Sequence, residues 1–218
     1  MESKVSRRGF VAASTAASAS RILGANERVR LGIIGSGGRG RFLMSEANKA
    51  GGIQWVAVAD AYDVQRDRAE QTAGAPLAKY VDYRRVLDHK DIDAVIVAVW
   101  DHMHCTVTVN ACQAGKDVYV EKPMTLHPME GHKIVEAVRA HKRILQTGTQ
   151  QRSWYEFRFA CELIRNGYIG DVKRIKVNVG GPPEECHLPA GGPPPQWLDY
   201  DAWLGQAPWR PFHPQLLG

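Results

Sequence analysis

Six residues near the start of the chain have the flexibility and the spacing needed to hold a phosphate group. Residues 35–40 read G-x-G-x-x-G, namely Gly35, Ser36, Gly37, Gly38, Arg39 and Gly40. In such a turn the first glycine permits a tight bend, the second lets the backbone approach a diphosphate, and the third lets helix and strand pack closely. The helix N-terminus adds free N–H groups and a positive dipole end. The pattern therefore predicts a dinucleotide site.

A carboxylate follows at the position where the ribose of such a ligand would lie. Asp60 ends the apolar run 53–59 and comes 20 residues after Gly40. At this spacing an acidic side chain can accept hydrogen bonds from the adenosine ribose hydroxyls. A carboxylate also repels a 2′-phosphate, so Asp60 favours NAD as the cofactor. NADP stays possible, because Arg66 could soften that preference.

Alternating strand and helix patterns supply the frame that positions these residues. Apolar runs predict strands at 29–34, 53–59, 78–81, 94–99, 117–120 and 144–147. A helical pattern follows the glycine turn, and further helices are predicted at 64–73, 83–87, 104–114 and 128–141. Six strands that alternate with helices indicate an α/β fold, a Rossmann-type doubly wound parallel sheet, over residues 28–150.

The composition excludes several other classes of protein. The 218 residues are 44% hydrophobic and 23% charged, with a formal net charge of +5. The basic residues are not clustered, so no nucleic-acid partner is expected. Four cysteines without a C-x-x-C pair exclude a disulfide scaffold and make a zinc site unlikely, so no metal ligands are assigned. No apolar run is long enough to predict a transmembrane helix.

The first 25 residues read as an export signal. Ser6-Arg7-Arg8-Gly9-Phe10 resembles the twin-arginine motif, and an Ala/Ser-rich stretch with a possible A-x-A cleavage site at 17–19 follows it. This predicts export of the folded protein to the periplasm or the medium, with no other membrane association. The alternative is an Ala/Ser-rich tail in which two arginines happen to be adjacent.

Motifs after the glycine turn resemble those of the Gfo/Idh/MocA oxidoreductase family, in its secreted, sugar-directed branch. The similarity covers nearly the whole chain after the signal. Beyond the glycine turn it includes Asp101-His102-Met103-His104, Gly115-Lys116-Asp117-Val118, Glu121-Lys122-Pro123, the run GTQQRS at 148–153, and the runs WLG at 203–205 and WRPFHP at 209–214.

The resemblance implies hydride transfer between nicotinamide and a sugar, polyol or related carbohydrate. It assigns Lys122 a catalytic and substrate-binding role, since an ammonium can hold the reacting hydroxyl and stabilise alkoxide charge. It also implies a cis-type turn at Pro123. Glu121 would lie at the cofactor, or would serve as the structural partner of a cation or backbone amide.

Three further residues have both a functional and a structural interpretation. The resemblance places His104 near the nicotinamide, although a histidine that caps the next helix fits equally well. Gln151 and Arg152 follow the sixth strand at the ligand edge of the sheet, where they would bind substrate. Arg152 could equally pair with an acidic side chain. In addition, Val99-Trp100 stands where the family usually carries a Thr-Pro turn.

Residues 151–218 are expected to begin a second, α+β substrate domain and to leave it incomplete. A helix is predicted at 154–166 and an alternating strand at 172–179. The Trp- and Pro-rich run 197–214 is either a loop packed on the sheet or a wall of the sugar pocket. The resemblance implies a downstream D-x-x-x-H motif that carries the acid/base histidine, and this segment has none. The chain therefore reads as truncated.

Three functions remain open from the sequence. The leading one is the N-terminal part of an exported NAD(P)-dependent oxidoreductase. The second is a nucleotide-binding remnant or subunit without turnover. The third is a glycosidase with a transient NAD redox cycle, although that branch generally lacks the lysine found at position 122. Full-length relatives would form homo-oligomers, which is doubtful for this chain.

Overall fold

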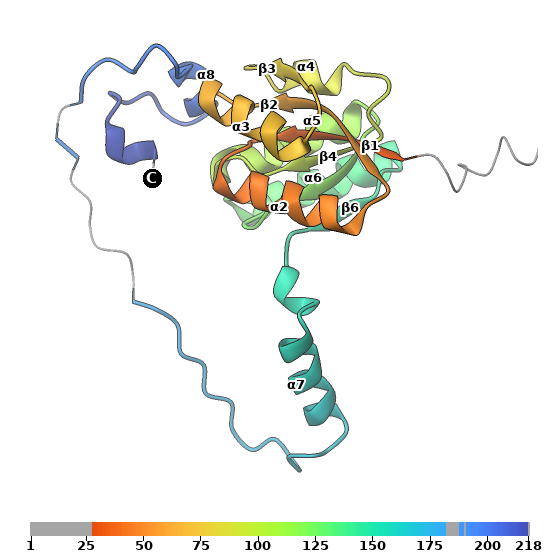
Figure 1. The fold of residues 1–218 in the computed structure, drawn as a ribbon. Coiled ribbons are helices and arrows are strands. Elements are labelled where there is room, and N and C mark those ends of the chain that lie inside the picture. Colours follow the sequence, from red (N-terminus) through yellow and green to blue (C-terminus); the bar gives the residue numbers. More distant parts are fainter. Residues whose placement is uncertain (1–27, 182–187, 190, 218) are drawn as a thin grey trace, which may run out of the picture.

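Six parallel strands form one sheet in the order β3-β2-β1-β4-β5-β6 in the computed structural model (Figure 1). The structure describes residues 28–181, 188–189 and 191–217. The strands are β1 (Val29–Ile34), β2 (Ile53–Ala59), β3 (Ala78–Tyr80), β4 (Ala94–Val97), β5 (Asp117–Val120) and β6 (Leu145–Thr147). Because the strand order reverses between β1 and β4, a crevice opens there at the carboxyl edge of the sheet. The predicted Rossmann-type sheet is confirmed.

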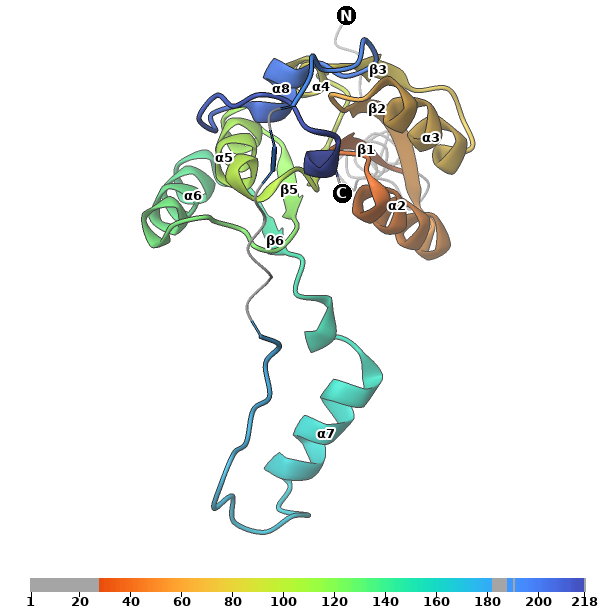
Figure 2. The same cartoon turned by 90° about the vertical axis from the view of Figure 1, so that its left-hand side faces the viewer.

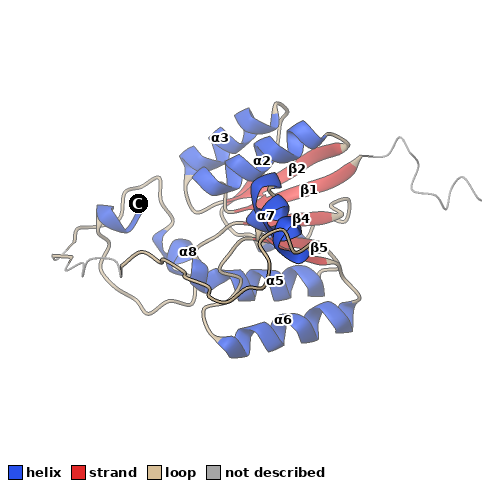
Figure 3. Cartoon of the chain, turned by 90° about the horizontal axis from the view of Figure 1, so that it is seen from below, coloured by secondary structure: helices blue, strands red, loops and turns tan. Residues whose placement is uncertain are grey.

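Helices cover both faces of this sheet (Figure 3). One face carries α2 (Gly38–Ala50) and α3 (Asp63–Ala73), whose Met44 and Ala69 are buried against Ile33 and Val58 of the strands. The other face carries α4 (Arg84–Leu87), α5 (His104–Gln113) and α6 (Pro128–His141). A sheet covered on both faces needs strands that are apolar on both sides, which explains the nearly continuous apolar runs at β1 and β4.

The chain leaves this body after β6. A short turn, η2 (Gln150–Arg152), is followed by α7 (Tyr155–Arg165), which extends away from the sheet (Figures 1 and 2). No residue of α7 is buried among the described residues. The predicted domain boundary at residue 150 falls in η2 and stays a prediction.

The strand predicted at 172–179 does not form. This stretch is exposed and has no regular secondary structure. Val177 is 74% exposed and Val179 is 85% exposed. A strand needs a neighbour that pairs with its backbone groups, and none of the described residues provides one here. Alternation of side chains alone is therefore not sufficient to produce this strand.

The last described segment returns to the sheet. It contains α8 (Tyr200–Leu204) and η3 (Pro214–Leu217), and its own small core is formed by Leu198, Tyr200, Leu204 and Phe212. Leu198 forms a bridge with Tyr62, which follows β2. The described part of the chain contains no helix with the length and apolarity needed to cross a membrane.

Candidate active site

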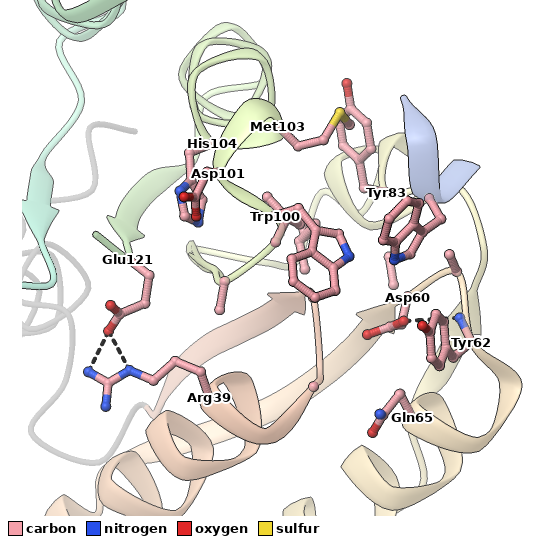
Figure 4. Close-up of a pocket in the computed structure, with 18 of the residues that line it drawn as sticks. Arg39, Asp60, Tyr62, Gln65, Tyr83, Trp100, Asp101, Met103, His104 and Glu121 are labelled. Carbon is pink, nitrogen blue, oxygen red and sulfur yellow. Dashed lines mark hydrogen bonds and ion pairs between the residues drawn. The ribbon is translucent and has the colours of Figure 1, made fainter. Parts of the chain in front are cut away.

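A cavity of about 560 Å³ lies at the carboxyl edge of the sheet, beside the point where the strand order reverses. Its walls come from the turns after β1, β2, β4, β5 and β6, and from α8. Figure 4 shows its two ends, with Asp60 and Tyr62 at one and Glu121 and His104 at the other. We call these the Asp60 end and the Lys122 end, since Lys122 follows Glu121 in the lining.

Glycine is present at the three positions of the G-x-G-x-x-G turn for different structural reasons. Gly35 has a φ of +84°, and a Cβ there would lie 2.4 Å from the carbonyl oxygen of Ala98. A Cβ on Gly40 would lie 2.1 Å from the carbonyl oxygen of Gly35. A Cβ on Gly37 would meet no atom within 4 Å, and Gly37 lines the cavity. The fold therefore requires Gly35 and Gly40, whereas Gly37 leaves space for a ligand.

The first turn of α2 faces the same space. Gly38 and Arg39 begin the helix and line the cavity. The first N–H groups of a helix have no partner within the helix and carry the positive end of its dipole. Together with the open space at Gly37, this arrangement suits a diphosphate, so the chain offers a cradle of the kind that NAD requires.

Asp60 is held by local hydrogen bonds. Its Oδ2 accepts from the backbone N–H of Ser36 at 2.7 Å and from the Ser36 hydroxyl at 3.2 Å, and its Oδ1 accepts from the N–H of Tyr62 at 3.0 Å. Burial raises the pKa of the carboxyl, and these hydrogen bonds oppose the rise. A carboxylate has about four acceptor positions, so Oδ1 can still accept from a ribose hydroxyl. Ser36 is buried outside the lining and acts here through Asp60.

The side chain of Arg66, which the sequence left open as a partner for a 2′-phosphate, is bound to protein groups instead. Its guanidinium donates to the backbone carbonyl of Asp60 and pairs with the carboxylate of Asp63. These contacts occupy the cation that could have favoured a 2′-phosphate. The geometry at the Asp60 end therefore suits the unphosphorylated ribose of NAD.

An ion pair joins the glycine turn to the Lys122 end. Nε and Nη2 of Arg39 donate to Oε1 of Glu121 at 2.8 and 2.6 Å, and Oε2 of Glu121 accepts from the N–H of Lys122 at 3.0 Å. The Glu121 side chain is only 4% exposed. A Cβ on Gly148 would lie 2.8 Å from Oε1, so a larger residue there would displace the Glu121 carboxylate. Glu121 thus partners both a cation and a backbone amide, and its contact with the cofactor stays a prediction.

His104 has one nitrogen fixed by the fold and one that is free. Its Nδ1 lies 2.6 Å from the carbonyl oxygen of Pro123, so Nδ1 carries the proton and Nε2 keeps a lone pair. Nε2 is buried and has no hydrogen-bond partner among the described residues. Burial lowers the pKa of the imidazole. His104 lines the cavity as well as opening α5, so a neutral acceptor is available at the Lys122 end.

The structure places the remaining predicted residues as follows. Lys122 lines the cavity, is exposed, and precedes Pro123 through a cis peptide bond, as the predicted cis-type turn requires. Gln151 and Arg152 are exposed in η2 and lie outside the lining. Their substrate contact stays a prediction. Gln150 lines the cavity instead, and its Oε1 is buried without a partner among the described residues.

Other lining residues were not singled out from the sequence as ligand contacts. Tyr62, Tyr83, Trp100 and Trp203 bring aromatic rings to the cavity. Tyr62 and Trp100 could have been found from their positions, because each follows the end of a predicted strand. Trp203 belongs to the run 197–214, which the sequence left open as a packed loop or a pocket wall, and its own position could not be specified because it lies more than 50 residues beyond the last strand.

The chain is similar to known proteins over this same region. Residues 29–149 match the family described as oxidoreductases with an NAD-binding Rossmann fold. Inositol 2-dehydrogenase 3 of Saccharopolyspora erythraea is 34% identical over 145 residues, which are 65% of this chain and 42% of that protein. Inositol 2-dehydrogenase of Klebsiella pneumoniae is 31% identical over 146 residues, covering 65% of this chain and 43% of that protein.

Solved structures agree with this result. The myo-inositol 2-dehydrogenase of Lactobacillus plantarum superposes with a TM-score of 0.62 at 29% identity, over 66% of this chain and 43% of that one. The chain therefore spans less than half the length of the relatives that it matches.

Proposed function

From the premise that the chain belongs to the Gfo/Idh/MocA family of oxidoreductases with an NAD-binding Rossmann fold, we propose that it contributes the coenzyme half of an enzyme that oxidises or reduces a polyol or sugar. The observation that carries this proposal is the position of Lys122 in the same cavity as the diphosphate cradle. The similarity to inositol dehydrogenases supports a polyhydroxylated ring as the substrate class.

NAD, when bound, supplies the group that accepts or gives the hydride. Around it, Gly37 and the start of α2 would hold the diphosphate, and Asp60 would hold the adenosine ribose. At the other end, the ammonium of Lys122 would donate a hydrogen bond to the substrate oxygen and favour its alkoxide form. Stabilising charge that develops in the transition state in this way is worth about 10²–10³ in rate for one donor.

Glu121 would fix the position of Lys122 without touching the substrate. Its Oε2 accepts from the backbone N–H of Lys122, while Arg39 holds Oε1. The lysine backbone is thereby tied to the turn that carries the diphosphate. The turn that would hold the diphosphate and the lysine that would hold the substrate hydroxyl are therefore joined by one connected network.

The experiment that tests the proposal is NADH formation with a panel of inositols and sugars, with wild type and Lys122→Ala side by side. We expect Lys122→Ala to lower kcat by about 10²–10³ and to leave the Kd for NAD nearly unchanged. Lys133→Ala is the matched control, because Lys133 is exposed on α6, pairs with Glu136 and lies outside the lining. Equal turnover in Lys122→Ala and wild type would contradict the proposal.

A second candidate is a nucleotide-binding subunit that does not turn over by itself. It is favoured by the diphosphate cradle and the ribose carboxylate, which are sufficient for nucleotide binding whether or not turnover follows. Binding of NAD without NADH formation from any member of the panel would support this candidate. Release of an aglycone from a glycoside without net NADH would instead support the redox-cycle glycosidase, which the lysine at position 122 disfavours.

We also propose that the protein is exported by the twin-arginine route. The support is the Ser6-Arg7-Arg8-Gly9-Phe10 motif, which lies outside the described residues. A fusion of residues 1–27 to a folded reporter should reach the periplasm, and replacing Arg7 and Arg8 by lysine should retain the reporter in the cytoplasm. Arg21→Lys, in the same segment but outside the motif, is the control. Export of the double variant at the wild-type level would contradict this proposal.

A further inference from the structure

The C-terminal segment 197–217 is fixed beside the carboxylate expected to hold the ribose. The N–H of Asp199 donates to the carbonyl of Ala61 at 3.0 Å, and the N–H of Asp63 donates to the carbonyl of Trp197 at 3.2 Å. Residues 61–63 come directly after Asp60. The position of this segment relative to Asp60 is thus set by backbone hydrogen bonds on both sides.

The same segment is anchored on the opposite side of the cavity, at the start of α5. Nε2 of His102 donates to the carbonyl of Leu204 at 2.9 Å, and the Thr106 hydroxyl donates to Oε1 of Gln206 at 3.1 Å. His102 is therefore a half-buried contact between the turn before α5 and this segment. Figure 2 shows α8 close to α5 and the C-terminal turn between the helices of the two faces. The segment spans the cavity.

Trp203 occupies the middle of this span. Its ring lies 5.5 Å from that of Trp100, edge to face, and 5.6 Å from that of Tyr200. It lines the cavity, as do Ala202 and Leu217. The unusual Trp100, in place of the family's usual proline, thus has a packing partner from the far end of the chain.

Two buried polar atoms in this part of the cavity lack hydrogen-bond partners. Nε1 of Trp203 is buried and has no hydrogen-bond partner among the described residues, and the same holds for the hydroxyl of Tyr62. Both residues line the cavity. A buried donor without a partner is unfavourable because its hydration is lost without replacement, so an acceptor on a ligand would relieve that cost. The unpaired indole N–H points to a ligand with an acceptor at the Asp60 end.

We propose that Trp203 binds the adenosine half of NAD, with its ring against the adenosine and its Nε1–H donating to an adenosine acceptor atom. Asp60 fixes the adenosine ribose, and the segment that carries Trp203 is bound to the residues that follow Asp60. An aromatic ring suits this partner because every nucleobase offers a π face for stacking. The inference rests on NAD as the coenzyme and does not depend on the proposed reaction.

Calorimetry on the full chain with NAD, ADP and nicotinamide mononucleotide tests this inference. Trp203→Phe keeps an aromatic ring and removes the N–H, so its Kd for NAD and for ADP should rise about five- to tenfold, the factor expected for one hydrogen bond. Trp203→Ala should raise both further. Nicotinamide mononucleotide, which lacks adenosine, should bind both variants as it binds wild type. Trp209→Phe is the control, because Trp209 is 74% exposed in the same segment and outside the lining.

Indole N–H resonances give a second readout that does not depend on affinity. The chain has six tryptophans, and the Trp203 resonance is identified by its loss in Trp203→Phe. Adding ADP to wild type should shift this resonance and slow its hydrogen exchange, while that of Trp209 stays in place. Unchanged ADP affinity in a folded Trp203→Phe, or a loss seen with nicotinamide mononucleotide instead, would overturn the inference. Failure of wild type to bind NAD would instead overturn the coenzyme assignment itself.

Discussion

The two ends of the cavity are built by different means. At the Asp60 end, the carboxylate is held by hydrogen bonds from Ser36 and Tyr62, both within one strand–helix–strand unit. At the Lys122 end, Arg39 pairs with Glu121, which lies 82 positions further along the chain and after another strand, whereas His104 contacts Pro123 only 19 positions away. Both ends contain buried polar atoms without a partner among the described residues, such as the Tyr62 hydroxyl at the first and Nε2 of His104 at the second, and the second also presents an exposed lysine. The carboxylate of Asp60 is thus held within one unit, whereas the carboxylate of Glu121 joins two units.

Gly37→Val should give the largest effect, because it acts on the diphosphate cradle that both ends share. The added side chain enters open space in the cavity, so several hydrogen bonds to the diphosphate are lost, on the order of 3 kcal/mol or a hundredfold in Kd for NAD. The unfolding free energy should fall by no more than about 1 kcal/mol, the cost of a less favourable N-cap residue for α2, since a Cβ there meets no protein atom within 4 Å. Calorimetry and urea unfolding measure the two quantities.

Gly131→Ala is the matched control for this variant, because a Cβ on Gly131 also meets no atom and Gly131 lies in α6, outside the lining. Its NAD affinity should equal that of wild type. Wild-type affinity in Gly37→Val would show that the diphosphate does not lie over this turn.

Asp60→Ala tests the proposed ribose contact at the Asp60 end. Loss of a hydrogen bond to a charged acceptor costs about 1.5–3 kcal/mol, so the Kd for NAD should rise about 10–100-fold. The Kd for NADP should rise much less, because the repulsion between the carboxylate and the 2′-phosphate is lost at the same time. Titrations with both coenzymes provide the comparison. An equal loss for NAD and NADP would exclude a ribose contact for Asp60.

Glu121→Gln tests the ion pair between Arg39 and Glu121 at the Lys122 end. The change weakens two charge-assisted hydrogen bonds from Arg39, so the unfolding free energy should fall by about 1–3 kcal/mol. Glu46→Gln is the control, because Glu46 forms an exposed pair with Lys49, and exposed pairs contribute about 0–1 kcal/mol. Urea unfolding measures both variants. If the two variants lose the same stability, the Arg39–Glu121 pair does not hold the two turns together.

His104→Gln tests the free imidazole and should give the smallest effect. The pKa of His104 is lowered by burial below its ordinary value of 6.5, so below pH 6.5 the unfolded chain binds a proton that the folded chain resists. Wild type should therefore lose stability as pH falls from 6.5, with a contribution from this group of at most about 1.4 kcal/mol per pH unit. The glutamine variant should lack this contribution.

Unfolding measured at a series of pH values gives the slope. His141→Gln, at an exposed position at the end of α6, should keep the wild-type slope. A wild-type slope in His104→Gln would show that this imidazole is not held neutral by the fold.

The same contrast explains what the sequence could predict. The sheet, the glycine turn and Asp60 were predictable because apolar periodicity, turn glycines and short spacings are local signals. The partner of Glu121 and the arrival of Trp203 at the cavity depend on contacts between distant residues, which periodicity does not reveal. The strand at 172–179 was wrong for a related reason, since alternation describes one strand and says nothing about whether a neighbour pairs with it.

The late position of Trp203 in the chain has a consequence for synthesis. Trp203 lies 56 positions after Thr147, the end of the last strand. At about 5–20 residues per second, the ribosome needs roughly 3–11 s to add them. During that interval the sheet can form while the crevice is still uncovered on one side. With the proposed contact between Trp203 and adenosine, full affinity for the nucleotide would be reached only after translation has passed this tryptophan.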